Sequence, residues 1–113
     1  MAEDQTQKFI EHLVTNNRVM LFMKGNKMFP QCGFSAAVVE VLKKHSVPFE
    51  AFNVLSDMNV RDGIKEYSDW PTIPQLYVNG EFVGGCDIVR EMAETGELEQ
   101  LFTEKGVASQ TLA

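Results

Sequence analysis

The sequence places one cysteine where a thiol could do chemistry. Cys32 lies within residues 24–35, which lead from an apolar segment through Gly, Pro and Lys into an apolar pattern with helical spacing. We expect that helix to begin at Gly33 or Phe34, so that its unpaired N–H groups and positive dipole end point at the sulfur. Both effects favour the thiolate, which is the form that attacks disulfides and binds metals.

Two lysines lie close to this cysteine in the sequence. Lys24 and Lys27 could both add to the bias toward thiolate. The alternative is an inert buried thiol, because free cysteine is among the most buried residue types. The neighbouring Pro, Gly and Lys favour an exposed turn, and we therefore prefer the reactive interpretation of Cys32.

Composition limits the classes of protein to consider. The chain has 113 residues and a net charge of −6, which fits one compact domain and argues against nucleic acids or acidic membranes as partners. Its two cysteines are 54 positions apart, which predicts a reducing compartment and no disulfide framework. We expect no membrane span, secretion signal or transit peptide here, although a mature form with its targeting peptide removed would look the same.

Apolar spacing predicts the helices and strands that must position Cys32. Residues 19–23 form an unbroken apolar run, typical of a short strand covered on both faces. Asn79-Gly80 between two apolar segments is a strong hairpin signal. We expect helices over 4–16, from 33 or 34 to about 44, over 58–68, from 87 to about 95 and from about 98 to a stop at Gly106, with strands over 19–23, 47–54, 75–78 and 81–84. The predicted inward faces of the helices are Phe9, Ile10, Leu13 and Val14; Phe34, Ala37, Val38, Val41 and Leu42; Val60, Ile64 and Tyr67; Ile88, Val89 and Met92; and Leu98, Leu101 and Phe102.

The order of these elements predicts an α/β fold of the thioredoxin-like type. Strand, helix, strand at the start implies a right-handed parallel crossover, and the hairpin adds two antiparallel strands. The result is a four-stranded mixed sheet with helices on both faces. We expect a single domain over residues 1–113, with a core over about 5–106 and a mobile tail over 107–113.

Four short blocks carry a resemblance to a known family. They are Lys24-Gly25, Cys32-Gly33-Phe34-Ser35, Trp70-Pro71-Thr72-Ile73-Pro74-Gln75 and Gly84-Gly85-Cys86-Asp87. In this order they resemble the monothiol glutaredoxins, and the resemblance covers about residues 9–105. Residues 47–50 and 64–68 look most like plastid and cyanobacterial members of that family. The family has the thioredoxin-like fold.

The resemblance implies a glutathione site beside Cys32. It places a cis peptide bond between Ile73 and Pro74, which would present the Ile73 backbone to a peptide-like ligand that pairs as an added strand. Lys24 and Arg61 resemble the residues that hold the glycyl carboxylate. The alternatives are prolines that only stiffen a loop and, for Arg61, a solvated helix charge.

The other end of glutathione would meet the start of a helix. The backbone N–H groups of Cys86 and Asp87 resemble those that take the γ-glutamyl carboxylate, and the Asp87 side chain the group that meets the amine. Gly84 and Gly85 would permit close approach of the backbone. The alternative for Asp87 is a helix N-cap.

Ser35 stands where a dithiol enzyme has a second cysteine. A Cys-x-x-Cys pair can close its own disulfide, so Cys32 must find its resolving thiol elsewhere. Glutathione could provide it. Cys86 is a candidate resolving thiol, and we predict a Cys32–Cys86 disulfide provided that the two Cα atoms lie within about 7 Å. The alternative for Cys86 is a small apolar residue in a tight turn.

The Gly-Phe-Ser sequence after Cys32 implies a cluster as well. By resemblance, two subunits would share one [2Fe-2S] cluster, held by two Cys32 thiolates and two glutathione thiolates. The cluster-bound form would be a homodimer and the apo form a monomer. The implied partners are BolA-family proteins and apo iron-sulfur proteins. We expect His12 and His45 to be surface residues and not ligands.

Three functions remain open at this point. The first is a carrier that stores and transfers the [2Fe-2S] cluster. The second is a glutathione-dependent thiol-disulfide oxidoreductase that removes glutathione from mixed disulfides through Cys32, and the third a binding module with vestigial thiol chemistry. The resemblance favours the chloroplast stroma as the compartment, with the mitochondrial matrix or bacterial cytoplasm as alternatives.

Overall fold

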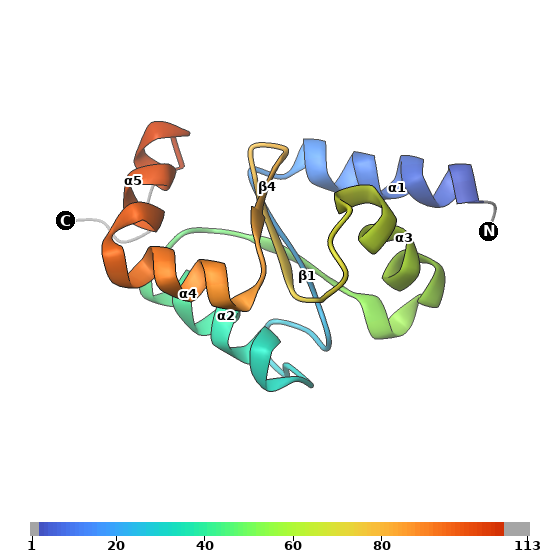
Figure 1. Ribbon diagram of the computed structural model, residues 1–113, viewed down its shortest axis with the longest axis horizontal. Helices are drawn as coiled ribbons and strands as arrows, with labels where there is room; N and C mark the ends of the chain where they lie inside the picture. The colour runs from blue at the N-terminus through green and yellow to red at the C-terminus, as the bar shows by residue number, and fades with distance from the viewer. Residues whose placement is uncertain (1–2, 108–113) are drawn as a thin grey trace.

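The computed structural model describes residues 3–107, in which five α-helices and one 3₁₀ helix surround four strands. In chain order the elements are α1 (Glu3–Asn16), β1 (Val19–Met23), α2 (Gly33–Lys44), β2 (Glu50–Asn53), η1 (Val54–Ser56), α3 (Met58–Ser68), β3 (Gln75–Val78), β4 (Glu81–Gly84), α4 (Cys86–Thr95) and α5 (Glu97–Glu104). Figure 1 shows α1 and α3 on one side of the strands and α2 and α4 on the other.

The four strands form one mixed sheet in the order β2-β1-β3-β4. β1 pairs in parallel with β2 and antiparallel with β3, and β3 pairs antiparallel with β4. The helix α2 connects the two parallel strands, as the element order predicts. The thioredoxin-like arrangement expected from the sequence is therefore confirmed.

β1 joins two separate hydrophobic cores. All five of its residues are buried, and successive side chains point to opposite faces of the sheet. Leu21 and Met23 pack in a cluster with apolar residues of α2, α4 and α5, whereas Met20 and Phe22 pack in a cluster with residues of α1 and α3. Because both faces hold this strand, the loop that leaves its carboxyl end starts from a fixed point.

The hairpin between β3 and β4 has the predicted two-residue turn. Asn79 and Gly80 have φ values of 51° and 81°, as a turn with two left-handed residues requires. The N–H of Asn79 also donates to the carbonyl of Arg18 at 2.7 Å. The hairpin is thus tied to the start of β1.

The second strand is shorter than the predicted 47–54, because it runs only over Glu50–Asn53. Pro48 has no N–H with which to join a ladder. At the other end, the side-chain oxygen of Asn53 accepts hydrogen bonds from the N–H groups of Gly25 and Leu55, each at 2.9 Å. These bonds end the strand and begin η1, a 3₁₀ turn that the sequence reading did not predict.

One residue of the predicted inward stripe of α2 faces solvent. Phe34 is 63% exposed, whereas its neighbour Ser35 is fully buried. The helix begins at Gly33, so Phe34 lies in the first turn, beyond the part of α2 that packs on the sheet. The prediction for Phe34 is therefore wrong, and this side chain is exposed two residues after Cys32.

The predicted mobile tail is also wrong at its first residue. Val107 is buried, and its N–H donates to the carbonyl of Phe102 at 2.8 Å. Gly106, the predicted stop of the last helix, precedes it with a φ of 71°. Residues 108–113 lie outside the described residues. None of the helices in the described part has both the length and the apolar character to cross a membrane.

Candidate functional site

Cys32 lies at the N-cap of α2, at the end of a tight loop that begins where β1 ends. Gly25 has a φ of +88°, and a Cβ at this position would lie 2.5 Å from both the Gln31 nitrogen and the Phe29 carbonyl oxygen. The N–H of Gln31 donates to the carbonyl of Lys24 at 2.9 Å and closes the loop. Because only glycine fits there, Gly25 sets the path of the loop that leads to Cys32.

The start of α2 lowers the pKa of the Cys32 thiol below its ordinary value. The backbone N–H of Ser35 is the main cause, because it donates to the sulfur. The N–H of Phe34, the charge of Lys24 and the hydroxyl of Ser35 act in the same direction, whereas partial burial opposes them. This agrees with the expectation that the helix start favours a thiolate.

Lys27 does not contribute to this effect, contrary to the prediction. Its Nζ donates to the carbonyl of Phe49, lies 4.5 Å from the centre of the Phe49 ring and is 3.8 Å from a carboxylate oxygen of Glu50. Among the groups that shift the pKa of Cys32, Lys24 is present and Lys27 is not. The loop turns Lys27 toward the edge strand β2.

Ser35 is part of the site although it carries no second thiol. Its side chain is fully buried, and its Oγ accepts a hydrogen bond from the N–H of Lys24 at 3.1 Å. The same hydroxyl contributes to lowering the pKa of Cys32. Ser35 therefore connects the end of β1 to the sulfur.

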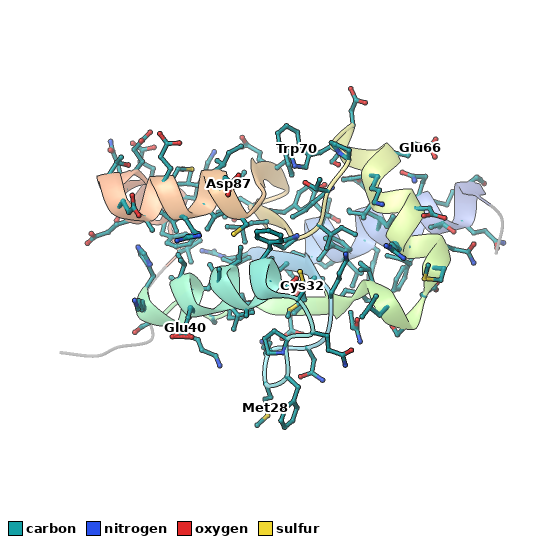
Figure 2. The ribbon with its side chains drawn as sticks, turned by 60° about the horizontal axis from the view of Figure 1, so that its bottom comes forward. Met28, Cys32, Glu40, Glu66, Trp70 and Asp87 are labelled. Atoms are coloured by element: carbon teal, nitrogen blue, oxygen red, sulfur yellow. The ribbon has the colours of Figure 1, made fainter. Side chains whose placement is uncertain are left out.

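A pocket of about 200 Å³ lies beside the first turn of α2. Figure 2 shows Cys32 at the start of α2, with Asp87 at the start of α4 and Trp70 on the segment that precedes β3. The residues that line the pocket are Phe34, Trp70, Thr72, Ile73, Pro74, Gly85, Cys86, Asp87 and Ile88. They come from three separate segments of the chain, at residue 34, residues 70–74 and residues 85–88.

A family model described as Glutaredoxin matches residues 19–83. The chain belongs to the glutaredoxin family. It is 58% identical over 97 residues to a protein of Synechocystis named as an uncharacterized monothiol glutaredoxin, covering 86% of this chain and 91% of that protein. It is 54% identical over 96 residues to a chloroplastic monothiol glutaredoxin of Arabidopsis thaliana, covering 85% of this chain and 56% of that protein.

Solved structures agree with this assignment. A reduced apo glutaredoxin of poplar superposes with a TM-score of 0.82 at 49% identity, covering 93% of this chain and 97% of that one. A truncated monomeric mutant of a Trypanosoma brucei glutaredoxin gives a TM-score of 0.85 at 39% identity, covering 94% and 96%. The relatives named as monothiol glutaredoxins include cyanobacterial, chloroplastic and mitochondrial proteins. The resemblance that the four sequence blocks indicate is therefore confirmed, and the protein is a monothiol glutaredoxin.

Four of the six predicted glutathione-binding residues of this glutaredoxin meet in the pocket. Ile73 and Pro74 lie on one wall, with the peptide bond between them in the cis form that the resemblance implies. Cys86 and Asp87 form another wall. The other two predicted residues, Lys24 and Arg61, are half-buried residues outside this lining.

Asp87 is not the N-cap of α4, so the alternative considered for this residue is wrong. The N-cap is Gly85, and Asp87 is an exposed residue of the first turn. Gly85 has no side chain to accept the first N–H groups of the helix. The first residues of α4, Cys86 and Asp87, therefore line the pocket at a helix start that has no side-chain cap.

Cys86 is a free thiol, as is Cys32. Cys86 is only 8% exposed and belongs to the cluster of apolar residues around α2 and α4, which agrees with its interpretation as a small apolar residue. Its position in the pocket lining is also compatible with a thiol that reaches the ligand. Its role as a resolving thiol stays a prediction.

Sequence reasoning assigned no role to two residues that line the pocket, Trp70 and Thr72. Both lie in the block before Pro74, so the signal was present in the motif. Trp70 packs against Phe82, with 5.8 Å between ring centroids.

The described residues contain no group of three His, Cys, Asp or Glu side chains that could hold a metal ion. His12 is exposed, as predicted. His45 is half-buried, because its Nδ1 lies 2.9 Å from the carbonyl of Val41 and its ring packs on Phe102. Of the two free thiols within residues 3–107, Cys32 is half-exposed and Cys86 is buried, so one chain alone offers Cys32 as its accessible thiol.

Proposed function

We propose that this glutaredoxin binds glutathione next to Cys32 and, as a homodimer, carries a [2Fe-2S] cluster to apo iron-sulfur proteins. One observation carries the proposal: each chain presents a single activated, half-exposed thiol at the start of α2. A second thiol in the motif is replaced by the buried Ser35. A cluster at this thiol therefore needs further sulfur ligands, which glutathione could supply.

The ligand count supports sharing of the cluster. A [2Fe-2S] cluster is held by about four thiolates, whereas one chain offers one thiolate at this surface. Two Cys32 residues and two bound glutathione molecules would complete the set. The cluster is cargo in this proposal, bound by the dimer and released to a recipient, and the apo protein is a monomer.

Glutathione would lie along the pocket, with its thiol toward Cys32. The backbone of Ile73, beside Pro74, would pair with the peptide, and the N–H groups of Cys86 and Asp87 would take the γ-glutamyl carboxylate. The Asp87 carboxylate would meet the amine. Lys24 and Arg61 would hold the glycyl carboxylate from outside the pocket lining.

The partners follow from the same proposal. BolA-family proteins and apo iron-sulfur proteins would bind the functional end of the molecule, where Cys32 and the exposed Phe34 lie. The relatives occur in chloroplasts, mitochondria and cyanobacteria. Among these compartments, we propose the chloroplast stroma if the source is eukaryotic.

A glutathione-dependent oxidoreductase is the second candidate, and the lowered pKa of Cys32 favours it. The Cys32 thiolate would attack the glutathione sulfur of a protein–glutathione disulfide, forming a Cys32–glutathione disulfide and releasing the protein thiolate. A glutathione thiolate would then attack that disulfide, giving oxidised glutathione and the free Cys32 thiolate. Each step exchanges one disulfide for another.

Anaerobic reconstitution with iron, sulfide and glutathione tests the carrier function. We expect visible absorption of a [2Fe-2S] cluster and a dimer in gel filtration, both lost in Cys32→Ser and when glutathione is omitted. A wild-type protein that stays colourless and monomeric, or a Cys32→Ser variant that still takes up cluster, would refute it. Fast turnover of a glutathionylated substrate by a colourless protein would favour the oxidoreductase.

A further inference from the structure

The indole nitrogen of Trp70 stands out among the polar groups of the fold. Within residues 3–107, its Nε1 is the buried side-chain nitrogen or oxygen that lacks a hydrogen-bond partner. A buried donor without an acceptor costs free energy, and native proteins satisfy nearly all such groups. An orphaned donor in the wall of a pocket therefore indicates that its acceptor arrives with a ligand.

This nitrogen lies close to Gly85. A Cβ on Gly85 would lie 3.4 Å from Trp70 Nε1 and 3.3 Å from the carbonyl oxygen of Pro74. It would also lie 3.9 Å from Thr72 Oγ1. Gly85 thus leaves a small space on which three polar atoms of the segment 70–74 converge. All four of these residues line the 200 Å³ pocket.

The same space lies at the start of a helix. Gly85 is the N-cap of the ten-residue helix α4 and gives its first N–H groups no side-chain acceptor. These N–H groups and the indole N–H are all donors, which together suit a carboxylate. Asp87 in the first turn would repel a bare anion, so the fitting ligand group carries an ammonium beside its carboxylate.

We infer that Trp70 is a specificity-determining residue whose indole N–H donates a hydrogen bond to the carboxylate of the γ-glutamyl head of glutathione. The inference rests on the proposed binding of glutathione and adds a recognition contact to it. The Nε1 atom is covered in the free protein, so a small turn of the indole would accompany binding. The competing interpretation is that Trp70 only packs on Phe82, in which case the donor would stay unpaired.

The single tryptophan of the chain makes a direct test available. The indole N–H gives one cross-peak in a ¹H–¹⁵N correlation spectrum, and we expect glutathione to shift it downfield and slow its hydrogen exchange. The dipeptide Cys-Gly, which lacks the γ-glutamyl head, should leave the peak in place. An indole peak unchanged by saturating glutathione would overturn the inference.

Affinity measurements provide the second arm. Trp70→Phe should weaken glutathione binding about tenfold and leave Cys-Gly binding unchanged, so that discrimination between the two probes falls. Gly85→Ala, which keeps the indole and fills the space before it, should have the same effect if Trp70→Phe fails to fold. Equal glutathione affinity in wild type and in both folded variants would refute the role of Trp70, whereas a wild-type protein that binds no glutathione would refute the proposed function itself.

Discussion

The backbone N–H of Lys24 donates a hydrogen bond to the fully buried hydroxyl of Ser35 at 3.1 Å. This contact ties the end of β1 to the first turn of α2, and the same hydroxyl helps to lower the pKa of Cys32. Ser35, which stands where a dithiol enzyme has its second cysteine, therefore holds these two segments together. The pKa of the Cys32 thiol depends in part on Ser35.

Replacing Ser35 with Ala should raise the pKa of Cys32 and destabilise the fold. The variant loses the hydroxyl that helps to lower this pKa, and it leaves the Lys24 N–H without its acceptor. We expect a loss of about 1–2 kcal/mol in the free energy of unfolding. The rate of iodoacetamide alkylation as a function of pH reports the pKa, and its midpoint should move to higher pH. Ser56→Ala removes an exposed hydroxyl that donates to the carbonyl of Asn53 and is not among the groups that lower the pKa of Cys32, so it should leave that midpoint where it is.

Lys24→Gln should also raise the pKa of Cys32, whereas Lys27→Gln should not. The charge of Lys24 stabilises the thiolate, but the Lys27 ammonium contacts Phe49 and Glu50 instead. Alkylation profiles at low and high ionic strength measure the difference, because salt screens an exposed charge. The Lys24 effect should shrink at high salt. Equal shifts in the two variants would show that both lysines face the thiol.

The thiolate should make stability depend on pH. Since the pKa of folded Cys32 is below its ordinary value of 9.0, unfolding takes up a proton between the two pKa values. The stabilisation is therefore fully present above about pH 9 and is lost as the pH falls through the lowered pKa of the folded state. Urea denaturation of wild type and Cys32→Ser at a series of pH values tests this, and the wild-type advantage should grow with pH. An advantage that is constant over this range would contradict the lowered pKa.

Gly25→Ala should damage the loop far more than Gly80→Ala damages the hairpin. Both glycines have positive φ, 88° and 81°, but only at Gly25 would a Cβ meet backbone atoms, at 2.5 Å. We expect about 1 kcal/mol of destabilisation for Gly80→Ala and more than about 2 kcal/mol for Gly25→Ala. Chemical denaturation measures both values. Similar losses in the two variants would mean that the loop can move aside.

Local sequence patterns determined the elements of this protein. The apolar run 19–23, the Asn79-Gly80 turn and the helix start after Cys32 all appear in the structure as predicted, because each depends on neighbours within a few residues. The strand bounds near Pro48 and Asn53 were less predictable, since a side-chain contact between Asn53 and the distant Gly25 ends β2.

The composition of the site depended on the tertiary structure. Lys24 and Lys27 look equivalent in the sequence, yet the loop geometry imposed by Gly25 turns only Lys24 toward the sulfur. The orphaned nitrogen of Trp70 could not be inferred from its motif, because its burial depends on how that segment packs beside Gly85 and the start of α4. Spacing along the chain predicts contacts within one element, whereas packing between elements decides which side chains share a pocket.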